Sequence, residues 1–582
     1  MKIAMIQCDS VPGDVAGNAA LILREARRAS GAALCVTPEL ALCGPQPGEY
    51  LHARDFARGV RRALDTLAAE LADGPALLVG APAPSLSRPG GFANAAVLLH
   101  GGRLQVVSRK VRPNQRRHGL PGAEALPWDD GVSCGILSLT GWRLGVVVCE
   151  DAAMRADAFW RQPPPGAPDP LGDLTRRGVD AIIHMTASPY RPHAQEEAER
   201  MLSHVAAREH VHLVSVNLVG GDGATVYSGQ SVAFDPAGRL LARARAFAPD
   251  LVLVDTAADA REEAGSGVET GAEPGELPVN PVAPACAGEE ESCWRALVLG
   301  TRDYVLKCGA SRVLLGLSGG MDSALVACVA AEALGPENVT GVLMPSPHTS
   351  RASVEDAEAL ARNLGVSTLT VPIAGLMEAF AGALGPGLER FPAWPGDVTL
   401  ENLQARIRGT ILTSLANRAR ALVLNTGNKS EVAMGYCTLY GDAVGALAVI
   451  GDLTKTQVYA LGRWLNAWKG QELIPEAVFV KAPSAELRPG QKDTDSLPPY
   501  DELDPLLERL LAPPLPAQDG ESAHGAAKTP EAEPSGLEAD VRRRLFGSEF
   551  KRRQLPPALR VSGVPFGEDG WQAPTAGRYR MP

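Results

Sequence analysis

A short run near the middle of the chain combines a phosphate-binding turn with a carboxylate. Ser318, Gly319 and Gly320 follow the apolar segment RVLLGL and precede the Ala-rich segment MDSALVACVAAEALG. A glycine-rich turn between a strand and a helix presents unpaired backbone N–H groups and the positive end of the helix dipole to an anion. No lysine follows the glycines; Asp322 and Ser323 come instead. A carboxylate beside phosphates would repel them unless a divalent metal joined the two, so the run predicts a phosphate site that uses Mg²⁺.

The complete pattern S-G-G-x-D-S after a buried strand resembles the loop of the ATP pyrophosphatases. In that superfamily the loop holds the pyrophosphate that leaves when ATP adenylates a substrate. A bare Gly-Gly pair would more often be a tight turn that only allows close packing, but the full pattern is much rarer. Because the superfamily includes GMP, asparagine and argininosuccinate synthetases, the loop predicts adenylation without fixing the substrate.

Four further segments narrow the substrate. They are ENLQARIRGTILTSLAN from Glu401, NTGNKSEVAMGYCTLYGDAVGALAVIGDLTKTQVYAL from Asn425, KAPSAELRPGQKDTDSLPPYDELD from Lys481 and KRRQLPPALRV from Lys551. Together they resemble NAD synthetases over nearly all of residues 290–582. The resemblance implies a doubly wound parallel sheet, Rossmann-like and of the adenine nucleotide alpha hydrolase type. It also implies a ligase that adenylates deamido-NAD (nicotinic acid adenine dinucleotide) with ATP and then amidates it with ammonia, releasing AMP and pyrophosphate.

The same resemblance implies roles for individual residues. ATP and pyrophosphate are expected at Ser318, Gly319, Gly320, Asp322, Ser323, Thr426 and Lys455. Deamido-NAD is expected at Arg406, Asp442 and Lys551, and Mg²⁺ at Asp322 and Glu431. Taken alone, Lys455 and Arg406 could be solvated surface charges; their positions inside long motif matches favour the site.

Three residues in the first half stand at the ends of strand-like runs. Glu39 lies in TPELALCG, Lys110 in VVSRKVRPN and Cys149 in GVVVCEDAA. Side chains at strand ends can converge on one rim of a sheet. This trio resembles the nitrilase superfamily, in which Glu, Lys and Cys hydrolyse amides. The resemblance implies that Cys149 attacks the amide of glutamine, that Glu39 is the general base and that Lys110 holds the oxyanion.

Two more segments, TASPY at 186–190 and VNLVGG at 216–221, extend the nitrilase resemblance through residues 1–255. Ser188 and Tyr190 of the first segment are the expected glutamine-binding residues. Cysteines 8 and 35 lie in apolar strands without such partners, and we interpret them as core residues.

The first half also departs from its relatives in two places. After Lys110 the chain reads RPNQRRHGLPGAEALPW, with no acid at the offset where relatives carry a glutamate that supports the lysine. Glu124 could take that part by a different path, or the support could be missing. The segment G-G-Q-D-E, which usually follows V-N-x-x-G, is replaced by GGDGATVYSG. Both changes concern glutamine recognition or the rate of its hydrolysis.

The elements that must position these residues alternate in two blocks. Residues 1–255 alternate apolar runs with amphipathic segments at 18–30 and 193–210, which predicts an α/β domain, and the resemblance implies a nitrilase-like α-β-β-α sandwich. Residues 256–289 lose this rhythm and read as a linker, and 290–582 form the second α/β domain. Within it, Ser353, Asp356 and Gly365 suggest a helix with a capping box and a glycine stop. Residues 511–535 are predicted to be a disordered insertion.

Composition sets broad limits. The chain has 582 residues, 45% hydrophobic and 21% charged, which is ordinary for a globular protein of two or more domains. A formal net charge of -11 argues against nucleic acid or an anionic membrane as a partner. We find no signal peptide and no membrane span, and expect a cytoplasmic enzyme. Ten cysteines without a C-x-x-C pair fit neither a disulfide framework nor a zinc site.

The leading hypothesis is a glutamine-dependent synthesis of NAD in which the first domain supplies ammonia to the second. A second hypothesis keeps an ammonia-dependent synthetase and treats the first domain as impaired, because of the two altered segments. A third makes the first domain a silent scaffold for oligomerisation. The relatives suggest a homo-oligomer, and the expected partners are the small molecules deamido-NAD, ATP and L-glutamine.

Overall fold

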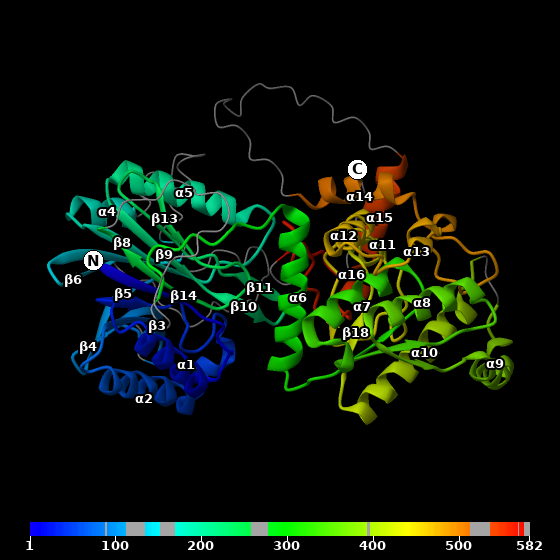
Figure 1. The fold of residues 1–582 in the computed structure, drawn as a ribbon. Helices are drawn as coiled ribbons and strands as arrows, with labels where there is room; N and C mark the ends of the chain where they lie inside the picture. The colour runs from blue at the N-terminus through cyan, green and yellow to red at the C-terminus, as the bar shows by residue number, and fades with distance from the viewer. Residues whose placement is uncertain are drawn as a thin grey trace, which may run out of the picture. The chain divides into compact units, whose positions relative to one another are not determined.

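The computed structural model describes residues 1–87, 90–111, 134–149, 151, 169–257, 277–392, 396–512, 536–567 and 570–575 (Figure 1). The chain divides into two compact units, residues 1–300 and 301–582. Each unit is built around its own β-sheets, as expected for a chain too long for one hydrophobic core.

The first unit contains two six-stranded sheets and a small hairpin. One sheet has the order β14-β1-β2-β3-β4-β5 and the other β13-β12-β9-β8-β7-β6. The strands of the first sheet are β1 (Lys2–Gln7), β2 (Leu34–Val36), β3 (Ala76–Pro84), β4 (Phe92–His100), β5 (Arg103–Arg109) and β14 (Asp250–Asp255). Those of the second are β6 (Gly135–Leu139), β7 (Trp142–Val148), β8 (Ala181–Thr186), β9 (His212–Asn217), β12 (Val232–Phe234) and β13 (Leu240–Arg243). Strands β10 (Val219–Asp222) and β11 (Thr225–Ser228) form the hairpin.

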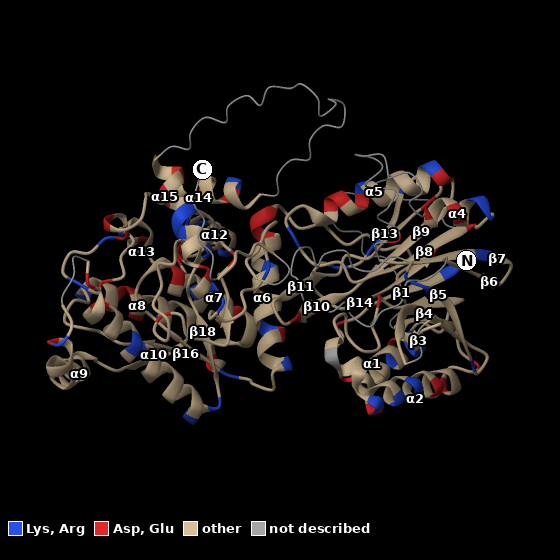
Figure 2. Ribbon diagram, turned by 180° about the vertical axis from the view of Figure 1, so that it is seen from behind, with Lys and Arg blue, Asp and Glu red and all other residues tan. Residues whose placement is uncertain are grey.

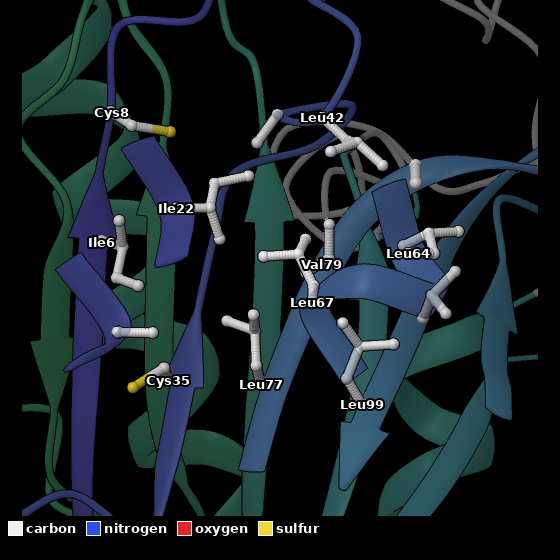
Figure 3. Packing of buried hydrophobic residues seen from close by; sticks show 14 of the residues in the cluster. Ile6, Cys8, Ile22, Cys35, Leu42, Leu64, Leu67, Leu77, Val79 and Leu99 are labelled. Carbon is white, nitrogen blue, oxygen red and sulfur yellow. The ribbon is translucent and has the colours of Figure 1, made fainter. Parts of the chain in front are cut away.

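Alternating side chains divide this unit into four layers. Along β1, Ile3 and Met5 face the second sheet, whereas Ala4 and Ile6 face the helices. Helices α1 (Val15–Arg28) and α2 (Arg54–Glu70) cover the outer face of the first sheet. Figure 3 shows Ile22 of α1 and Leu67 of α2 packed toward the buried strand residues. Helices α4 (Pro170–Arg176) and α5 (Ala194–Glu209) cover the second sheet in the same way. The predicted α-β-β-α sandwich is confirmed.

The outward faces of these helices carry mixed charges. Acidic and basic residues are interspersed along α2 and α5 (Figure 2). This is the solvated face of an amphipathic helix whose other face is buried.

The second unit has one parallel sheet of order β17-β16-β15-β18-β19. Its strands are β15 (Val313–Gly316), β16 (Val339–Leu343), β17 (Ser367–Thr370), β18 (Leu422–Asn425) and β19 (Leu447–Ala448). The strand order reverses between β15 and β18. In open α/β sheets, the crevice beyond the carboxyl ends of such neighbouring strands is where ligands bind.

Helices flank this sheet and continue beyond it. Those of the sheet region are α7 (Met321–Leu334), α8 (Arg351–Leu364), α9 (Ala374–Leu388), α10 (Thr399–Ala419), α11 (Lys429–Met434) and α12 (Lys455–Lys469). Helix α6 (Glu289–Lys307) contains the division between the two units at residue 300. The last four are α13 (Glu476–Val480), α14 (Tyr500–Leu511), α15 (Gly536–Gly547) and α16 (Glu549–Arg552). Short 3₁₀ turns are η1 (Gly48–His52), η2 (Pro336–Asn338) and η3 (Asp493–Asp495). Leu412 of α10 packs on the sheet beside Leu314, and the predicted doubly wound domain is confirmed.

The helix predicted to open at Ser353 begins earlier. Helix α8 starts at Arg351, and its N-cap is Ser350, whose hydroxyl accepts a hydrogen bond from the Ser353 N–H at 3.1 Å. The prediction of a capping box at Ser353 was wrong because the Ser353 hydroxyl is directed to Glu486 at 2.7 Å. Gly365 ends the helix with a φ of 71°, so the predicted glycine stop is confirmed.

Part of the predicted linker 256–289 is ordered against the first unit. Val279 and Val282 form β-bridges to Leu253 and Arg243. The disordered insertion predicted for 511–535 was placed too early at its start, because Leu511 is the buried last residue of α14. Residues 258–276, 513–535 and Glu124 lie outside the described residues, so the disorder predicted for 513–535 is not tested. Cys8 and Cys35 are buried in the core as predicted, and burial raises the pKa of each thiol to about 12.

Within the described ranges, no helix is both long enough and apolar enough to span a membrane.

Candidate active sites

The S-G-G-x-D-S loop joins β15 to α7 at the point where the strand order reverses. Gly319 has a φ of +74°, and a Cβ there would lie 2.0 Å from the Ser353 carbonyl oxygen, so only glycine fits. The Ser318 and Ser323 hydroxyls contact each other at 3.1 Å, and Gly320 N–H donates to Ser318 Oγ at 3.2 Å. Gly320 is the N-cap of α7 and supplies no side chain. Because no side chain caps α7, its first turn presents backbone N–H groups beside the loop, as expected of an anion-binding turn.

One lysine contacts two carboxylates beside this loop. Lys455 Nζ pairs with Asp322 Oδ2 and lies 3.5 Å from Glu431 Oε1. Burial alone would lower the pKa of Lys455, but Asp322 and Glu431 outweigh burial and raise it. Lys455 therefore stays protonated. The structure thus brings together three predicted site residues from α7, α11 and α12.

Glu431 is held at the start of α11 by a reciprocal cap. Asn428 accepts the Glu431 N–H at 3.0 Å, and Glu431 accepts the Asn428 N–H at 3.3 Å. Asn428 also donates to Asp322 Oδ1 at 3.1 Å. Burial, opposed by Lys455 and reinforced by Asp322, raises the pKa of Glu431 to about 8. Two carboxylates held this close favour either a shared proton or a cation between them.

The donor set suits Mg²⁺ only together with phosphates. Among the described residues no three His, Cys, Asp or Glu side chains form a metal cluster. Mg²⁺ usually takes one or two protein carboxylates and completes its shell with substrate phosphates and water. Asp322 and Glu431 match that pattern. A hollow of about 440 Å³ beside them is lined by Lys455, Tyr459, Lys481 and Tyr500. Lys481 also donates to the Gly319 carbonyl oxygen at 3.2 Å, so both lysines lie beside the loop.

Asp504, which the sequence analysis did not single out, holds two helix N-termini in place. Its Oδ1 accepts the Ser430 hydroxyl at 2.6 Å, and its Oδ2 accepts the Thr456 N–H at 2.8 Å. Ser430 Oγ in turn accepts the Lys455 N–H at 2.9 Å. Because Ser430 precedes Glu431 and Thr456 follows Lys455, this buried carboxylate fixes the spacing of both site residues.

A second group of predicted residues surrounds Asp442. Its Oδ1 accepts the Thr438 N–H at 2.6 Å. Burial raises the pKa of Asp442 to about 6, opposed by that hydrogen bond and by the nearby cations Lys551, Arg408 and Arg406. Lys551 Nζ donates to the carbonyl oxygens of Gly435 and Cys437 at 2.8 and 2.7 Å. Several cations around one buried carboxylate are suited to binding an anionic group.

Asn425 joins the two groups. Its amide donates to the carbonyl oxygens of Asp442 and Val444 at 2.7 and 3.0 Å, and its Oδ1 accepts the Gly427 N–H at 2.9 Å. Thr426 lies between these anchors, at the carboxyl end of β18 and half-buried. It therefore lies across the strand-order switch from the S-G-G-x-D-S loop.

In the first unit, Glu39 and Lys110 form a buried ion pair. Lys110 Nζ lies 3.1 Å from Glu39 Oε1, and Asn94 Nδ2 donates to the same oxygen at 2.6 Å. The Ala187 N–H donates to Glu39 Oε2 at 3.2 Å. Gly80 makes room for this turn, because a Cβ there would lie 2.2 Å from the Pro38 carbonyl oxygen. Asn94 was not predicted, and it orients the Glu39 carboxylate.

Cys149 follows β7 in a left-handed conformation. Its φ is +48°, its N–H donates to the Met185 carbonyl oxygen at 2.9 Å, and His184 Nε2 contacts its carbonyl oxygen at 3.1 Å. The Thr186 hydroxyl donates to Cys149 Sγ at 3.6 Å and contacts the Ser188 hydroxyl at 2.7 Å. A strained backbone that turns a nucleophile out of a strand end is common at active sites.

The segment 186–189 joins the two parts of the thiol site, since Thr186 contacts Cys149 and Ala187 contacts Glu39. Tyr190 is directed elsewhere: its hydroxyl contacts Ser292 Oγ at 3.0 Å and its ring packs on Phe247. Of the two residues predicted to bind glutamine, only Ser188 lies in this hydrogen-bonded network.

Asp151 is a further residue that the sequence analysis missed. It is fully buried, and its carboxylate accepts the Val111 N–H at 2.9 Å. It therefore joins the end of β7 that carries Cys149 to the end of β5 that carries Lys110. The pattern C-E-D was the available signal, because the acid stands two residues after the nucleophile.

Comparison with known proteins gives the class that this fold and these two sites define. Residues 2–264 match the carbon-nitrogen hydrolase family and residues 293–555 match the NAD synthase family. Glutamine-dependent NAD(+) synthetases of Synechocystis and Thermotoga maritima are 40% and 37% identical, over 99% and 100% of this chain and 98% and 99% of their own.

A solved glutamine-dependent NAD(+) synthetase of Acinetobacter baumannii, in complex with ADP, is 30% identical with a TM-score of 0.70 and covers 96% of both chains. One from Cytophaga hutchinsonii, 19% identical with a TM-score of 0.74 over 100% of this chain and 97% of its own, shares the fold. The chain belongs to the glutamine-dependent NAD(+) synthetase family.

Proposed function

We propose that this chain forms NAD from deamido-NAD, ATP and glutamine, with the residues described above in defined roles. The second unit adenylates deamido-NAD and the first releases ammonia from glutamine. The observation that carries this proposal is the presence of both constellations in one chain: Lys455 with Asp322 and Glu431, and Glu39 with Lys110 and Cys149.

In the synthetase step, the nicotinate carboxylate of deamido-NAD attacks the α-phosphorus of ATP and pyrophosphate leaves. Negative charge grows on the leaving group, and backbone N–H groups of the Ser318–Gly320 loop, the hydroxyl of Ser323 and the ammonium of Lys455 stabilise it there. Thr426, across the crevice, contributes to the ATP site. Ammonia then attacks the acyl adenylate and AMP leaves.

Asp322 and Glu431 are the proposed Mg²⁺ carboxylates, since the two lie together beside the phosphate loop and a divalent cation would relieve their repulsion. When bound, Mg²⁺ would neutralise charge on the phosphate oxygens. The protein's part is to hold both carboxylates toward the loop through Asn428 and Lys455.

Arg406, Asp442 and Lys551 are the proposed deamido-NAD site. The cations around Asp442 suit an anionic substrate. Arg406 is exposed and donates to the Leu439 carbonyl oxygen at 3.3 Å, so its guanidinium keeps further donors for a ligand.

In the glutaminase step, Cys149 attacks the side-chain amide of glutamine. Glu39 accepts the thiol proton and passes it to the leaving ammonia, while Lys110 stabilises the oxyanion. Water, deprotonated by Glu39, then hydrolyses the thioester, which releases glutamate and restores the Cys149 thiol. Ser188 supports this centre through Thr186. Tyr190, in the same segment as Ser188, is the second proposed glutamine-binding residue. Because Lys110 pairs with Glu39, and the segment 186–187 contacts both Glu39 and Cys149, an impaired or silent first domain is the weaker hypothesis.

Assembly and location follow from the same proposal. We infer a homo-oligomer, supported by α9, where Leu376, Phe380, Leu384 and Leu388 recur every four residues and are exposed. Light scattering on the purified protein would measure its mass. We place the enzyme in the cytoplasm, which fractionation of cells would test.

The synthetase function is tested by substrate choice. With ATP, Mg²⁺ and ammonium, the purified protein should amidate deamido-NAD. Amidation of xanthosine monophosphate or aspartate with no reaction on deamido-NAD would refute the proposal.

A further inference from the structure

The β10–β11 hairpin is formed by the segment GGDGATVYSG, in which this chain departs from its relatives, and it lies next to the thiol site. Tyr227 pairs with Gly220 across the hairpin and forms a β-bridge to Pro189, which follows Ser188. Asp222 pairs with Thr225, two positions away from Tyr227 along β11. Side chains two positions apart share one face of a strand, so Asp222 and Tyr227 lie diagonally on the same face. Gly220 carries no side chain to cover the Tyr227 ring.

The Tyr227 hydroxyl accepts a hydrogen bond, but its own proton is not donated to any described residue. The residue is 2% exposed. Gln46, an exposed residue, donates to the hydroxyl oxygen at 3.4 Å, and no acceptor for the hydroxyl proton is present among the described residues. Burial raises the pKa of Tyr227, and Asp222, Glu39 and Cys149 raise it further, so the hydroxyl stays protonated close to the catalytic residues. A buried donor normally finds an acceptor, and a substrate oxygen would supply one here.

Glutamine, the proposed substrate of this site, has two charged groups that simple amides lack. Glutamine carries an α-carboxylate, which accepts hydrogen bonds, and an α-ammonium group, which donates them. The common face of the hairpin offers the complementary pair, a hydroxyl donor at Tyr227 and a carboxylate at Asp222. Neither residue is needed to hydrolyse an amide, because Glu39, Lys110 and Cys149 cover that chemistry.

We propose that Tyr227 and Asp222 recognise the α-amino-acid end of glutamine, Tyr227 donating to the α-carboxylate and Asp222 accepting from the α-ammonium group. This inference rests on the proposed glutaminase function and assigns its substrate specificity to the altered hairpin. Because a site built around a charged group discriminates strongly against ligands that lack it, loss of either contact should weaken glutamine binding about 10- to 100-fold.

The test separates recognition from chemistry. Glutamate release is measured for the full-length wild type, Tyr227→Phe and Asp222→Asn, with Tyr50→Phe as the control that removes a hydroxyl from an exposed ring. Iodoacetamide is the second probe, since it alkylates the Cys149 thiolate without needing an amino-acid end. We expect the KM for glutamine to rise at least tenfold in both variants, with the rate of iodoacetamide inactivation within twofold of wild type.

Protection against iodoacetamide assigns the two contacts. Glutamine should protect the wild type at a lower concentration than either variant. With glutaramate, which keeps the carboxylate but lacks the ammonium, Tyr227→Phe should still weaken protection and Asp222→Asn should not.

An unchanged KM in both variants would overturn the inference. A fall in the rate of iodoacetamide inactivation as large as the loss of glutamine turnover would also overturn it, because Tyr227 would then act by positioning Cys149 and not by binding glutamine. A wild type that releases no glutamate would contradict the proposed function itself, a separate outcome.

Discussion

Lys455 pairs with Asp322 across 133 residues of sequence, and the pair is largely buried at the N-terminus of α7. Glu431 shares the same lysine. The arrangement brings one cation and two carboxylates to a loop whose backbone N–H groups suit phosphates. It explains how the proposed phosphate site would tolerate acidic residues: the lysine neutralises part of their charge, and the proposed Mg²⁺ would neutralise the rest.

Removing Asp322 should abolish adenylation. Asp322→Ala deletes one proposed metal ligand and one partner of Lys455, so NAD formation should fall on the order of a thousandfold with either glutamine or ammonium. Glutamate release should persist, because the thiol site uses other residues. Glu332→Gln, at the far end of α7, is the matched control. Near-normal pyrophosphate release in Asp322→Ala would remove Asp322 from the metal site.

Replacing Asp504 should lower kcat, although Asp504 is not proposed to contact substrate. Asp504→Asn keeps the shape but lacks a second acceptor for the two donors Ser430 and Thr456. The ammonium-dependent kcat should fall about tenfold, because the spacing of Lys455 and Glu431 is no longer fixed. Glu502→Gln, exposed on the same helix, should retain full activity. If the kcat of Asp504→Asn stays within twofold of wild type, Asp504 does not position these residues.

The site contains both residues whose positions the sequence predicted and residues that it did not. The Ser318–Ser323 loop is contiguous, and its geometry follows from two glycines between a strand and a helix, so its place could be predicted. Both folds could be predicted as well, because alternating apolar runs set the layers and the motif resemblances implied the architectures. Asp504 and Asn94 could not be predicted, since each acts only through partners that are distant in sequence: Ser430 and Thr456 for Asp504, and Glu39 for Asn94. Each also stands in an ordinary helix or strand pattern.

The misplaced start of α8 has a related cause. Several hydroxyl residues precede that helix, and local spacing favoured Ser353. The distant partner Glu486 engages the Ser353 side chain and leaves Ser350 to cap the helix. A hydrogen bond to a residue distant in sequence therefore determined which serine caps the helix, and the local sequence pattern does not contain that information.

Asp442 should make stability depend on pH. Its pKa in the folded protein is raised to about 6 by burial, so between its ordinary value of 3.8 and about 6 the folded state binds more protons than the unfolded state. The stabilisation is complete below the ordinary pKa and is lost as pH rises through about 6, by at most about 1.4 kcal/mol per pH unit. Asp442→Asn removes this titration.

Melting temperatures of the wild type and Asp442→Asn, measured from pH 4.5 to 7.5, would test this. We expect the variant to gain relative to the wild type as pH rises through about 6 and the difference to level off above pH 7. A difference that stays constant over this range would mean that Asp442 titrates normally.

Cys149→Ala tests the division of labour between the two units most directly. The measurement is NAD formation from deamido-NAD and ATP, with glutamine and with a high concentration of ammonium at alkaline pH, on the same folded protein. Glutamine-dependent formation should fall by several orders of magnitude because the variant lacks the proposed covalent nucleophile. Ammonium-dependent formation should stay near the wild-type rate, since only free NH₃ is needed at the adenylate. Unchanged glutamine activity would make Cys149 a core cysteine, and loss of both activities would contradict two separable sites.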